Sequence, residues 1–273
     1  MLRARIMTAL VAIPVLLWMI YWGPQWCLNI FVLFMTFVAL REFAAMALEG
    51  VRGGTTMVVV GGMTIAFPMG LMQSGAAVSA GIVACLVIVM VGTLWTARDM
   101  PESVNRAGQI LLGCLYAGVL LPHFIWVHAV PGTGPGWVAM VLGVVMAGDA
   151  GGYFGGRAFG NRKLWPTVSP NKTVEGAASS FVMSLLVGVI FNIAASPHLG
   201  YLESALVCGI INILAQLGDL LESMLKRAYD AKDSGWIFPG HGGVLDRTDS
   251  LVLPIVFAYY YAILASEHFG SGW

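Results

Sequence analysis

Residues 219–250 read DLLESMLKRAYDAKDSGWIFPGHGGVLDRTDS and join two long apolar segments of the chain. Five polar side chains follow one another at alternating steps of four and three residues, namely Asn212, Gln216, Asp219, Ser223 and Lys226. This spacing predicts one polar stripe along a helix that is otherwise apolar back to about Leu206. From Gly235 onward, closely spaced glycine and proline residues predict a tight loop. A helix end with carboxylates, followed by a basic glycine-rich loop, indicates a site for a metal-bound polyphosphate.

The composition excludes an ordinary soluble protein. Of the 273 residues, 58% are hydrophobic and only 10% are charged, whereas soluble proteins carry about 25% charged residues. The shortage of charge extends along the whole chain, which favours an integral membrane protein over a soluble domain with one anchor. The formal net charge of +0 gives no reason to expect a nucleic-acid partner.

Apolar runs of roughly 20 residues are long enough to cross a bilayer as helices. We therefore predict an all-α fold, a polytopic transmembrane helical bundle forming one domain over residues 1–273. About nine spans are expected, at residues 4–22, 26–46, 56–73, 77–96, 107–127, 136–158, 176–195, 202–224 and 250–268. Spans one to five, about 1–127, would be a scaffold and a possible homodimer interface, and spans six to nine, about 136–268, the catalytic half.

The basic residues support this topology. With nine alternating spans, all 14 lysines and arginines fall on one side of the membrane and none on the other. Because positive residues gather in cytoplasmic loops, we expect a cytoplasmic N-terminus and active site, with the C-terminus outside. The expected location is a bacterial-type inner membrane.

The segment after residue 136 combines close-packing and chemical signals. Glycines at four-residue steps from Gly148 to Gly160 predict close helix packing. Asp149 lies among apolar residues, where a carboxylate is costly and indicates a functional or ion-linked role. The following basic segment, which includes Ser169, Lys172 and Thr173, is expected to be a loop leading into a helix N-terminus, a natural site for anions.

Polyphosphate chemistry needs a hard cation, oxygen ligands for it, and groups that hold the remaining phosphate oxygens. Asp219 and Asp246 come from two helix ends that the glycine-rich loop joins, and Asp249 follows Asp246 by three residues. Lysines and arginines in the same region supply positive charge. Glu222 and Asp230 are interpreted as structural or solvent-exposed.

Residues 223–250 closely resemble the signature of the phosphatidate cytidylyltransferase (CDP-diacylglycerol synthase) family. The matching residues are Ser223, Lys226, Arg227, Lys232, Asp233, Pro239, Gly240, His241, Gly242, Gly243, Asp246, Arg247 and Asp249. The upstream segment also resembles the family, at Asp149, Tyr153, Gly156, Gly160, Ser169, Pro170, Lys172, Thr173, Glu175 and Gly176. The resemblance covers about residues 149–250, and the first five spans match only in general character.

The resemblance implies transfer of a cytidylyl group from CTP to phosphatidate, giving CDP-diacylglycerol and pyrophosphate in phospholipid biosynthesis. It implies a requirement for Mg²⁺, with a second cation left open, and membrane lipids as surroundings. Our hypothesis assigns catalysis to Asp219, Asp246, Lys226, Arg247 and Lys172, and metal binding to Asp219, Asp246, Asp249 and Asp149. Substrate binding is assigned to Ser169, Thr173, Asn212, Ser223, Arg227, Lys232, Asp233, Gly240, His241, Gly242 and Gly243.

Two other functions remain open at this point. A CTP-dependent kinase of a polyprenol or another lipid alcohol would share the spans, CTP and Mg²⁺, but would transfer the γ-phosphoryl group. An ion-coupled transporter would use Asp149 and Asp219 as an intramembrane cation or proton site. The transporter would not need the loop chemistry, and no clear internal repeat of the kind many transporters have is visible.

Overall fold

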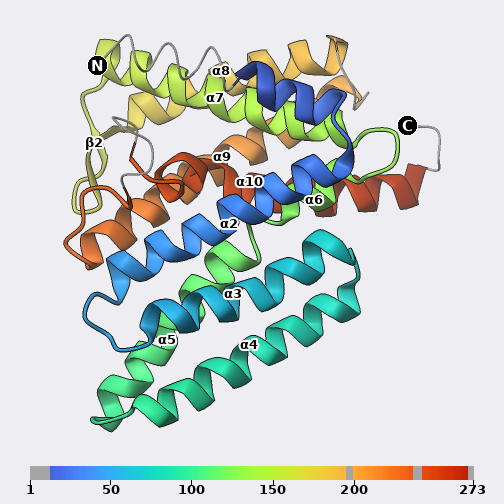
Figure 1. Ribbon diagram of the computed structural model, residues 1–273. Coiled ribbons are helices and arrows are strands. Elements are labelled where there is room, and N and C mark those ends of the chain that lie inside the picture. The colour runs from blue at the N-terminus through green and yellow to red at the C-terminus, as the bar shows by residue number, and fades with distance from the viewer. Residues whose placement is uncertain (1–12, 195–198, 236–241, 270–273) are drawn as a thin grey trace. The chain divides into compact units, whose positions relative to one another are not determined.

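The computed structural model describes residues 13–194, 199–235 and 242–269 (Figure 1). The long helices are α2 (Gln25–Ala47), α3 (Gly54–Leu71), α4 (Gly75–Thr96), α5 (Met100–Gly118), α7 (Gly134–Phe159), α8 (Val174–Ala194), α9 (Tyr201–Ala228) and α10 (Leu245–Phe269). A short helix, α6 (His123–His128), follows α5. The prediction of a helical fold is therefore confirmed.

Eight helical segments in the described part of the chain are long and apolar enough to cross a membrane. They correspond to the second to ninth predicted spans, and α5 and α6 together form the fifth, over Met100–His128. Residues 4–12 of the first predicted span, 4–22, lie outside the described residues, and residues 13–21 are helical. The chain is thus an integral membrane protein by the length and composition of its helices.

The segment between α7 and α8 differs from the expected loop. It forms an antiparallel hairpin of β1 (Lys163–Trp165) and β2 (Ser169–Thr173), in which Lys163 faces Thr173. Pro166 follows β1 directly and is compatible with a turn but not with helix continuation. The turn closes with a 3.2 Å hydrogen bond from the Val168 N–H to the Trp165 carbonyl.

Contacts within the chain form two compact units, which are described separately. Unit 1 contains Met1–Trp126 and Tyr229–Arg247, and unit 2 contains Val127–Ala228 and Thr248–Trp273. The prediction of a single domain remains a prediction.

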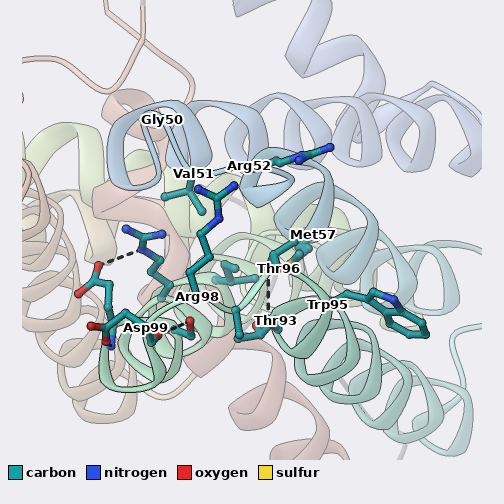
Figure 2. A pocket seen from close by; sticks show the side chains of 14 residues that line it. Gly50, Val51, Arg52, Met57, Thr93, Trp95, Thr96, Arg98 and Asp99 are labelled. Atoms are coloured by element: carbon teal, nitrogen blue, oxygen red, sulfur yellow. Dashed lines mark hydrogen bonds and ion pairs between the residues drawn. The ribbon is translucent and has the colours of Figure 1, made fainter.

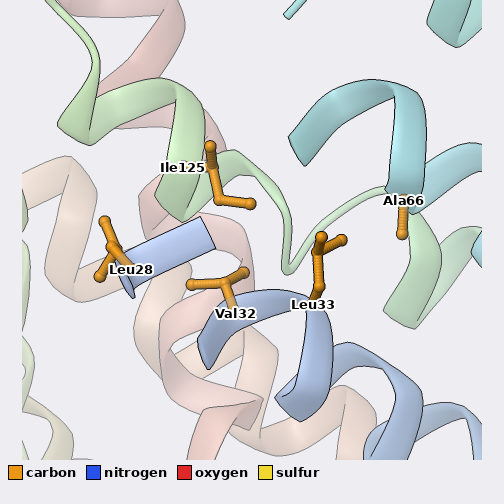
Figure 3. Close-up of a cluster of buried hydrophobic side chains, with 5 residues drawn as sticks. All are labelled: Leu28, Val32, Leu33, Ala66 and Ile125. Carbon is orange, nitrogen blue, oxygen red and sulfur yellow. The ribbon is translucent and has the colours of Figure 1, made fainter. Parts of the chain in front are cut away.

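In unit 1, α3 packs against α2, α4 and α5 (Figure 1). Figure 3 shows one apolar cluster of this unit, formed by Leu28, Val32, Leu33, Ala66 and Ile125. Helices α3 and α5 approach each other closely at Gly62 and Gly118. A Cβ atom on Gly118 would lie 2.7 Å from the Gly62 carbonyl oxygen, so only a residue without a side chain fits there.

In unit 2, α7 and α8 pack side by side, and α9 contacts both (Figure 1). The predicted role of the α7 glycines in close packing is confirmed, because a Cβ atom on Gly151 would lie 2.9 Å from the Ser179 carbonyl oxygen. In the same unit, Tyr261 on α10 contacts both α7 and α9. Its ring packs edge-on against Trp137, and its hydroxyl donates a hydrogen bond to Glu203. These contacts fix the helices that carry the polar groups described below.

We expect Gly118→Val to lower the free energy of unfolding by about 1–3 kcal/mol, because the new side chain must push α5 away from α3. The matched control is Gly108→Val in the same helix, since a Cβ atom at Gly108 meets nothing within 4 Å. Thermal unfolding of both variants in detergent measures the effect. Equal melting temperatures for the two variants would contradict the close approach at Gly118.

Candidate active site

The predicted polar stripe on α9 exists and forms a hydrogen-bonded network in unit 2. Asn212, which is buried, donates hydrogen bonds of 2.8 Å from Nδ2 to the hydroxyls of Ser180 and Ser184 on α8. Gln216 donates from Nε2 to the Asn212 Oδ1 at 2.6 Å and to the Ala177 carbonyl at 3.3 Å. The amides of the stripe therefore join α9 to α8. Asn212 is in this way a structural residue as well as a candidate binding residue.

The next polar residue of the stripe forms an ion pair with the hairpin. The Asp219 Oδ2 lies 2.5 Å from the Nζ of Lys172, which belongs to β2, and the Ser223 hydroxyl donates to the Asp219 Oδ1 at 3.4 Å. Lys172 and Asp219 are 27% and 32% exposed, so solvent still reaches this pair. The ion pair places a lysine and a carboxylate, 47 residues apart in sequence, at one point of the unit.

A cavity of about 500 Å³ opens beside this ion pair. Its walls come from α7, the hairpin, α8 and α9. The polar and charged residues of its wall are Asp149, Tyr153, Arg157, Asn171, Lys172, Thr173, Ser180, Gln216 and Asp219. The structure thus brings together the predicted site residues Asp149, Lys172, Thr173 and Asp219, whereas Ser169 lies at the start of β2 and does not line the cavity.

Local hydrogen bonds hold the hairpin in place at the cavity. The Glu175 carboxylate, in the first turn of α8, accepts from the backbone N–H groups of Asn161 at 3.0 Å and Arg162 at 3.2 Å. Thr173 accepts through Oγ1 from the Gly176 N–H at 3.1 Å, as a capping residue does at a helix start. Lys172 is therefore presented by a hairpin whose two ends are both tied to the start of α8.

A second carboxylate lies near Asp219. Asp249 on α10 is only 9% exposed, and its Oδ1 accepts from the Ser250 N–H at 2.7 Å and from the Ser250 hydroxyl at 3.1 Å. The charges of Asp219 and Lys226 both act on it. The two helices can approach here because Gly218 packs against the Asp249 backbone. Asp219, Asp249 and Lys226 therefore lie close enough in unit 2 to interact electrostatically.

Lys226 has a partner that our sequence analysis did not assign to the site. Its Nζ forms an ion pair with Glu222, which is 1% exposed, whereas we expected Glu222 to be structural or solvent-exposed. A buried carboxylate requires such a partner, because an isolated charge is costly in an apolar environment. The four-residue spacing of Glu222 and Lys226 was the available signal. Glu222 therefore orients the Lys226 side chain through this ion pair.

Asp246 is held separately, in unit 1, by three donors. Its Oδ2 accepts from the Ser234 N–H at 2.9 Å, the Ser234 hydroxyl at 2.8 Å and the Gly243 N–H at 2.9 Å. Gly242 adopts the left-handed φ of 77° next to it, and a Cβ atom there would lie 2.7 Å from the same oxygen. Asp246 therefore holds the backbone of Ser234 and Gly243 at the start of α10. Ser234 is a further residue that the sequence analysis missed.

Glu42 on α2 is the least expected member of this arrangement. It is 5% exposed, and its Oε2 accepts from the Leu245 N–H at 3.0 Å. The backbone N–H of Val244 also bonds to this carboxylate. Its other oxygen, Oε1, is buried and has no hydrogen-bond partner within the described parts of the chain. Glu42 therefore holds the backbone at Leu245, next to Asp246, although the two residues are more than 200 positions apart in sequence.

The remaining predicted residues lie outside these networks or outside the described residues. Arg227, Lys232, Asp233 and Arg247 have exposed side chains. Gly240 and His241 fall outside the described residues. The roles predicted for these residues remain predictions.

The described residues contain no group of three or more His, Cys, Asp or Glu side chains placed to hold a metal ion. However, Mg²⁺ commonly uses one or two carboxylates together with the phosphates of its substrate. Asp219 and Asp249 are two such carboxylates, and they lie close enough to interact electrostatically. Lys172 pairs with Asp219, and the positive charge of Lys226 acts on Asp249. The donor set of unit 2 therefore fits a cation that arrives with a polyphosphate.

We expect Glu42→Ala to lower the free energy of unfolding by about 1–3 kcal/mol, since the Leu245 N–H then remains buried without its acceptor. Hydrogen exchange of a peptide covering residues 242–247 should become faster for the same reason. The control is Glu49→Ala, because Glu49 is exposed at the end of the same helix. Unchanged exchange in Glu42→Ala would show that the carboxylate does not hold the loop.

The fold and the site define a membrane protein whose charged groups suit phosphate chemistry. The chain belongs to the cytidylyltransferase family, whose sequence profile matches residues 3–265. Its similarity is therefore not restricted to the signature and includes the first five spans.

Individual relatives are consistent with this assignment. The phosphatidate cytidylyltransferase of Staphylococcus haemolyticus is 31% identical over 267 residues, which cover 93% of this chain and 97% of that protein. The phosphatidate cytidylyltransferase of Brucella suis is 31% identical over 280 residues, covering 97% and 95%. The enzyme of the same name from Bacillus subtilis is 41% identical over 162 residues, covering 59% of this chain and 60% of that protein.

Proposed function

We propose that this protein transfers the cytidylyl group of CTP to phosphatidate, forming CDP-diacylglycerol and pyrophosphate. The observation that carries the proposal is the Lys172–Asp219 ion pair at the wall of a polar cavity of about 500 Å³ in a membrane-spanning unit. Lys172 supplies positive charge for phosphate oxygens, and Asp219 supplies the carboxylate that orients it. Relatives named phosphatidate cytidylyltransferase along nearly the whole chain support the choice of substrates.

In the proposed reaction, a phosphate oxygen of phosphatidate attacks the α-phosphorus of CTP. A new P–O bond forms, the bond to the β-phosphate oxygen breaks, and pyrophosphate leaves with the electron pair. A phosphomonoester is largely ionised near pH 7, because its second pKa is about 6. The protein therefore need not supply a general base for the nucleophile, and its main tasks are positioning and charge stabilisation.

Mg²⁺ bound with CTP would neutralise part of the triphosphate charge, and Asp219 and Asp249 would hold it. Lys172, which now pairs with Asp219, would then be released to phosphate oxygens, and Lys226 would add positive charge near Asp249. Glu222 would keep Lys226 aimed at the site. The buried network of Asn212 and Gln216 would prevent α8 and α9 from moving apart as charged substrates enter. The metal roles of Asp246 and Asp149 and the use of a second cation remain predictions.

The proposed setting is a bacterial inner membrane, with the N-terminus and the cavity at the cytoplasmic face and the C-terminus outside. The position of the lysines and arginines supports this orientation. CTP is a cytoplasmic nucleotide, so a cytoplasmic cavity also fits the proposed substrate. We further propose that the chain has no nucleic-acid partner and that a homodimer would use spans one to five.

The test of function uses purified protein in detergent with phosphatidate, Mg²⁺ and CTP labelled in the α-phosphate. We expect label to enter the lipid fraction while an equal amount of pyrophosphate is released. A parallel reaction with γ-labelled CTP and a polyprenol tests the lipid-alcohol kinase. Label in the lipid from the γ-phosphate alone would contradict cytidylyl transfer and support the kinase.

We expect Asp219→Asn and Lys172→Gln each to lower kcat by about 100-fold or more, which is typical when one charge-stabilising group is removed from an active site. The matched control is Lys163→Gln, because Lys163 belongs to the same hairpin but is exposed and does not line the cavity. Its turnover should remain close to that of the wild type. Wild-type turnover in Asp219→Asn would exclude the proposed role of this ion pair.

A further inference from the structure

A second cavity, of about 760 Å³, lies in unit 1 at the ends of α3, α4 and α5 (Figure 2). Three arginines line it. Arg52 belongs to the link before α3, Arg98 to the link between α4 and α5, and Arg106 to α5. Figure 2 shows Arg98 extending toward the segment of Gly50 and Val51, so the two links face each other across the cavity. The cavity plays no part in the proposed reaction.

The three arginines of this cavity differ in whether they have a charged partner in the described part of the chain. Arg106 forms a 2.9 Å ion pair with Glu102, and the Asp99 Oδ1 accepts from the Glu102 N–H at 3.1 Å to cap α5. By contrast, the Arg52 and Arg98 side chains make no ion pair or hydrogen bond with the part of the chain that the structure describes. Two guanidinium groups are therefore available to an external anion. Their planar array of donors suits phosphate oxygens in particular.

The surroundings of the cavity are apolar on one side. Trp95 lines it and is 83% exposed, and the neighbouring side chains of Leu94 and Met100 are 77% and 64% exposed. Helix α4 continues this exposed apolar face through Met90 and Val87. Tryptophan next to basic residues at a helix end is typical of the membrane–water interface. A ligand here would meet cationic groups and hydrocarbon-facing side chains together.

We propose that this cavity binds an anionic phospholipid, with the phosphate on Arg52 and Arg98 and the acyl chains along α4. Arg52 and Arg98 are exposed, but both line one cavity. They come from two separate links and lie next to an exposed apolar face. The proposal concerns binding only and is independent of the proposed reaction.

The test counts lipids retained on the purified protein by native mass spectrometry, with phosphatidylglycerol, phosphatidylcholine and inorganic phosphate as separate probes. We expect the wild type to retain phosphatidylglycerol in preference to phosphatidylcholine. Arg52→Gln and Arg98→Gln should each weaken binding about fivefold, the effect of one basic group near an anionic lipid surface. The control is Arg41→Gln, because Arg41 is exposed on α2 and does not line the cavity.

Glu102→Gln provides a second test in the opposite direction. It releases Arg106 from its ion pair, so phosphatidylglycerol should bind more tightly than to the wild type. Equal losses in Arg41→Gln and Arg98→Gln would overturn the proposal, since a general surface charge would then explain binding. Displacement of the lipid by inorganic phosphate at equal concentration would also overturn it, in favour of a site for free phosphate.

Discussion

The main constraint on this molecule is that polar groups inside an apolar, membrane-spanning bundle must find partners within the protein. Asn212 meets this need with two serine hydroxyls, and Lys226 meets it with Glu222. Each partnership lies between helices or between successive turns, so satisfying the polar groups also fixes the helices. The same contacts that reduce the cost of burial give the charged groups of unit 2 defined positions. Stability and site geometry thus depend on one set of interactions.

Several carboxylates in the described part of the chain accept hydrogen bonds from backbone N–H groups. Glu42 accepts from the start of α10, Asp246 accepts from Ser234 and Gly243, and Glu175 accepts from the chain before β1. The N-terminal end of a helix has unsatisfied N–H groups and a partial positive charge, so a carboxylate there is stabilising. Glu42 and Asp246 therefore hold the backbone at Ser234, Gly243 and Leu245, whatever further role Asp246 has. Gly235, Gly242 and Gly243 are needed because their backbone comes very close to the Glu42 and Asp246 carboxylate oxygens.

The sequence predicted the parts of the fold that depend on local periodicity. Long apolar runs gave eight described spans, and the spacing from Asn212 to Lys226 gave the stripe on α9. The Lys172–Asp219 pair and the link from Glu42 to Leu245 could not be predicted, because they join residues far apart in the chain. For Glu222, helical spacing showed a position beside the stripe but not whether the side chain is buried or exposed, and the structure shows it buried and paired with Lys226. The hairpin was missed because its strands are too short for an alternating pattern.

The hairpin restricts the number of residues that the segment between α7 and α8 can have. Successive side chains of a strand point to opposite faces, so the position of Lys172 beside Asp219 depends on the pairing of Lys163 with Thr173 and on the irregular register that separates it from the Trp165–Ser169 pair. Inserting or deleting one residue in β2 would rotate the lysine to the other face without disturbing any membrane helix. Exposed connections usually tolerate insertions and deletions. Over evolutionary time, this connection should instead accept many substitutions at its exposed positions while keeping a constant number of residues.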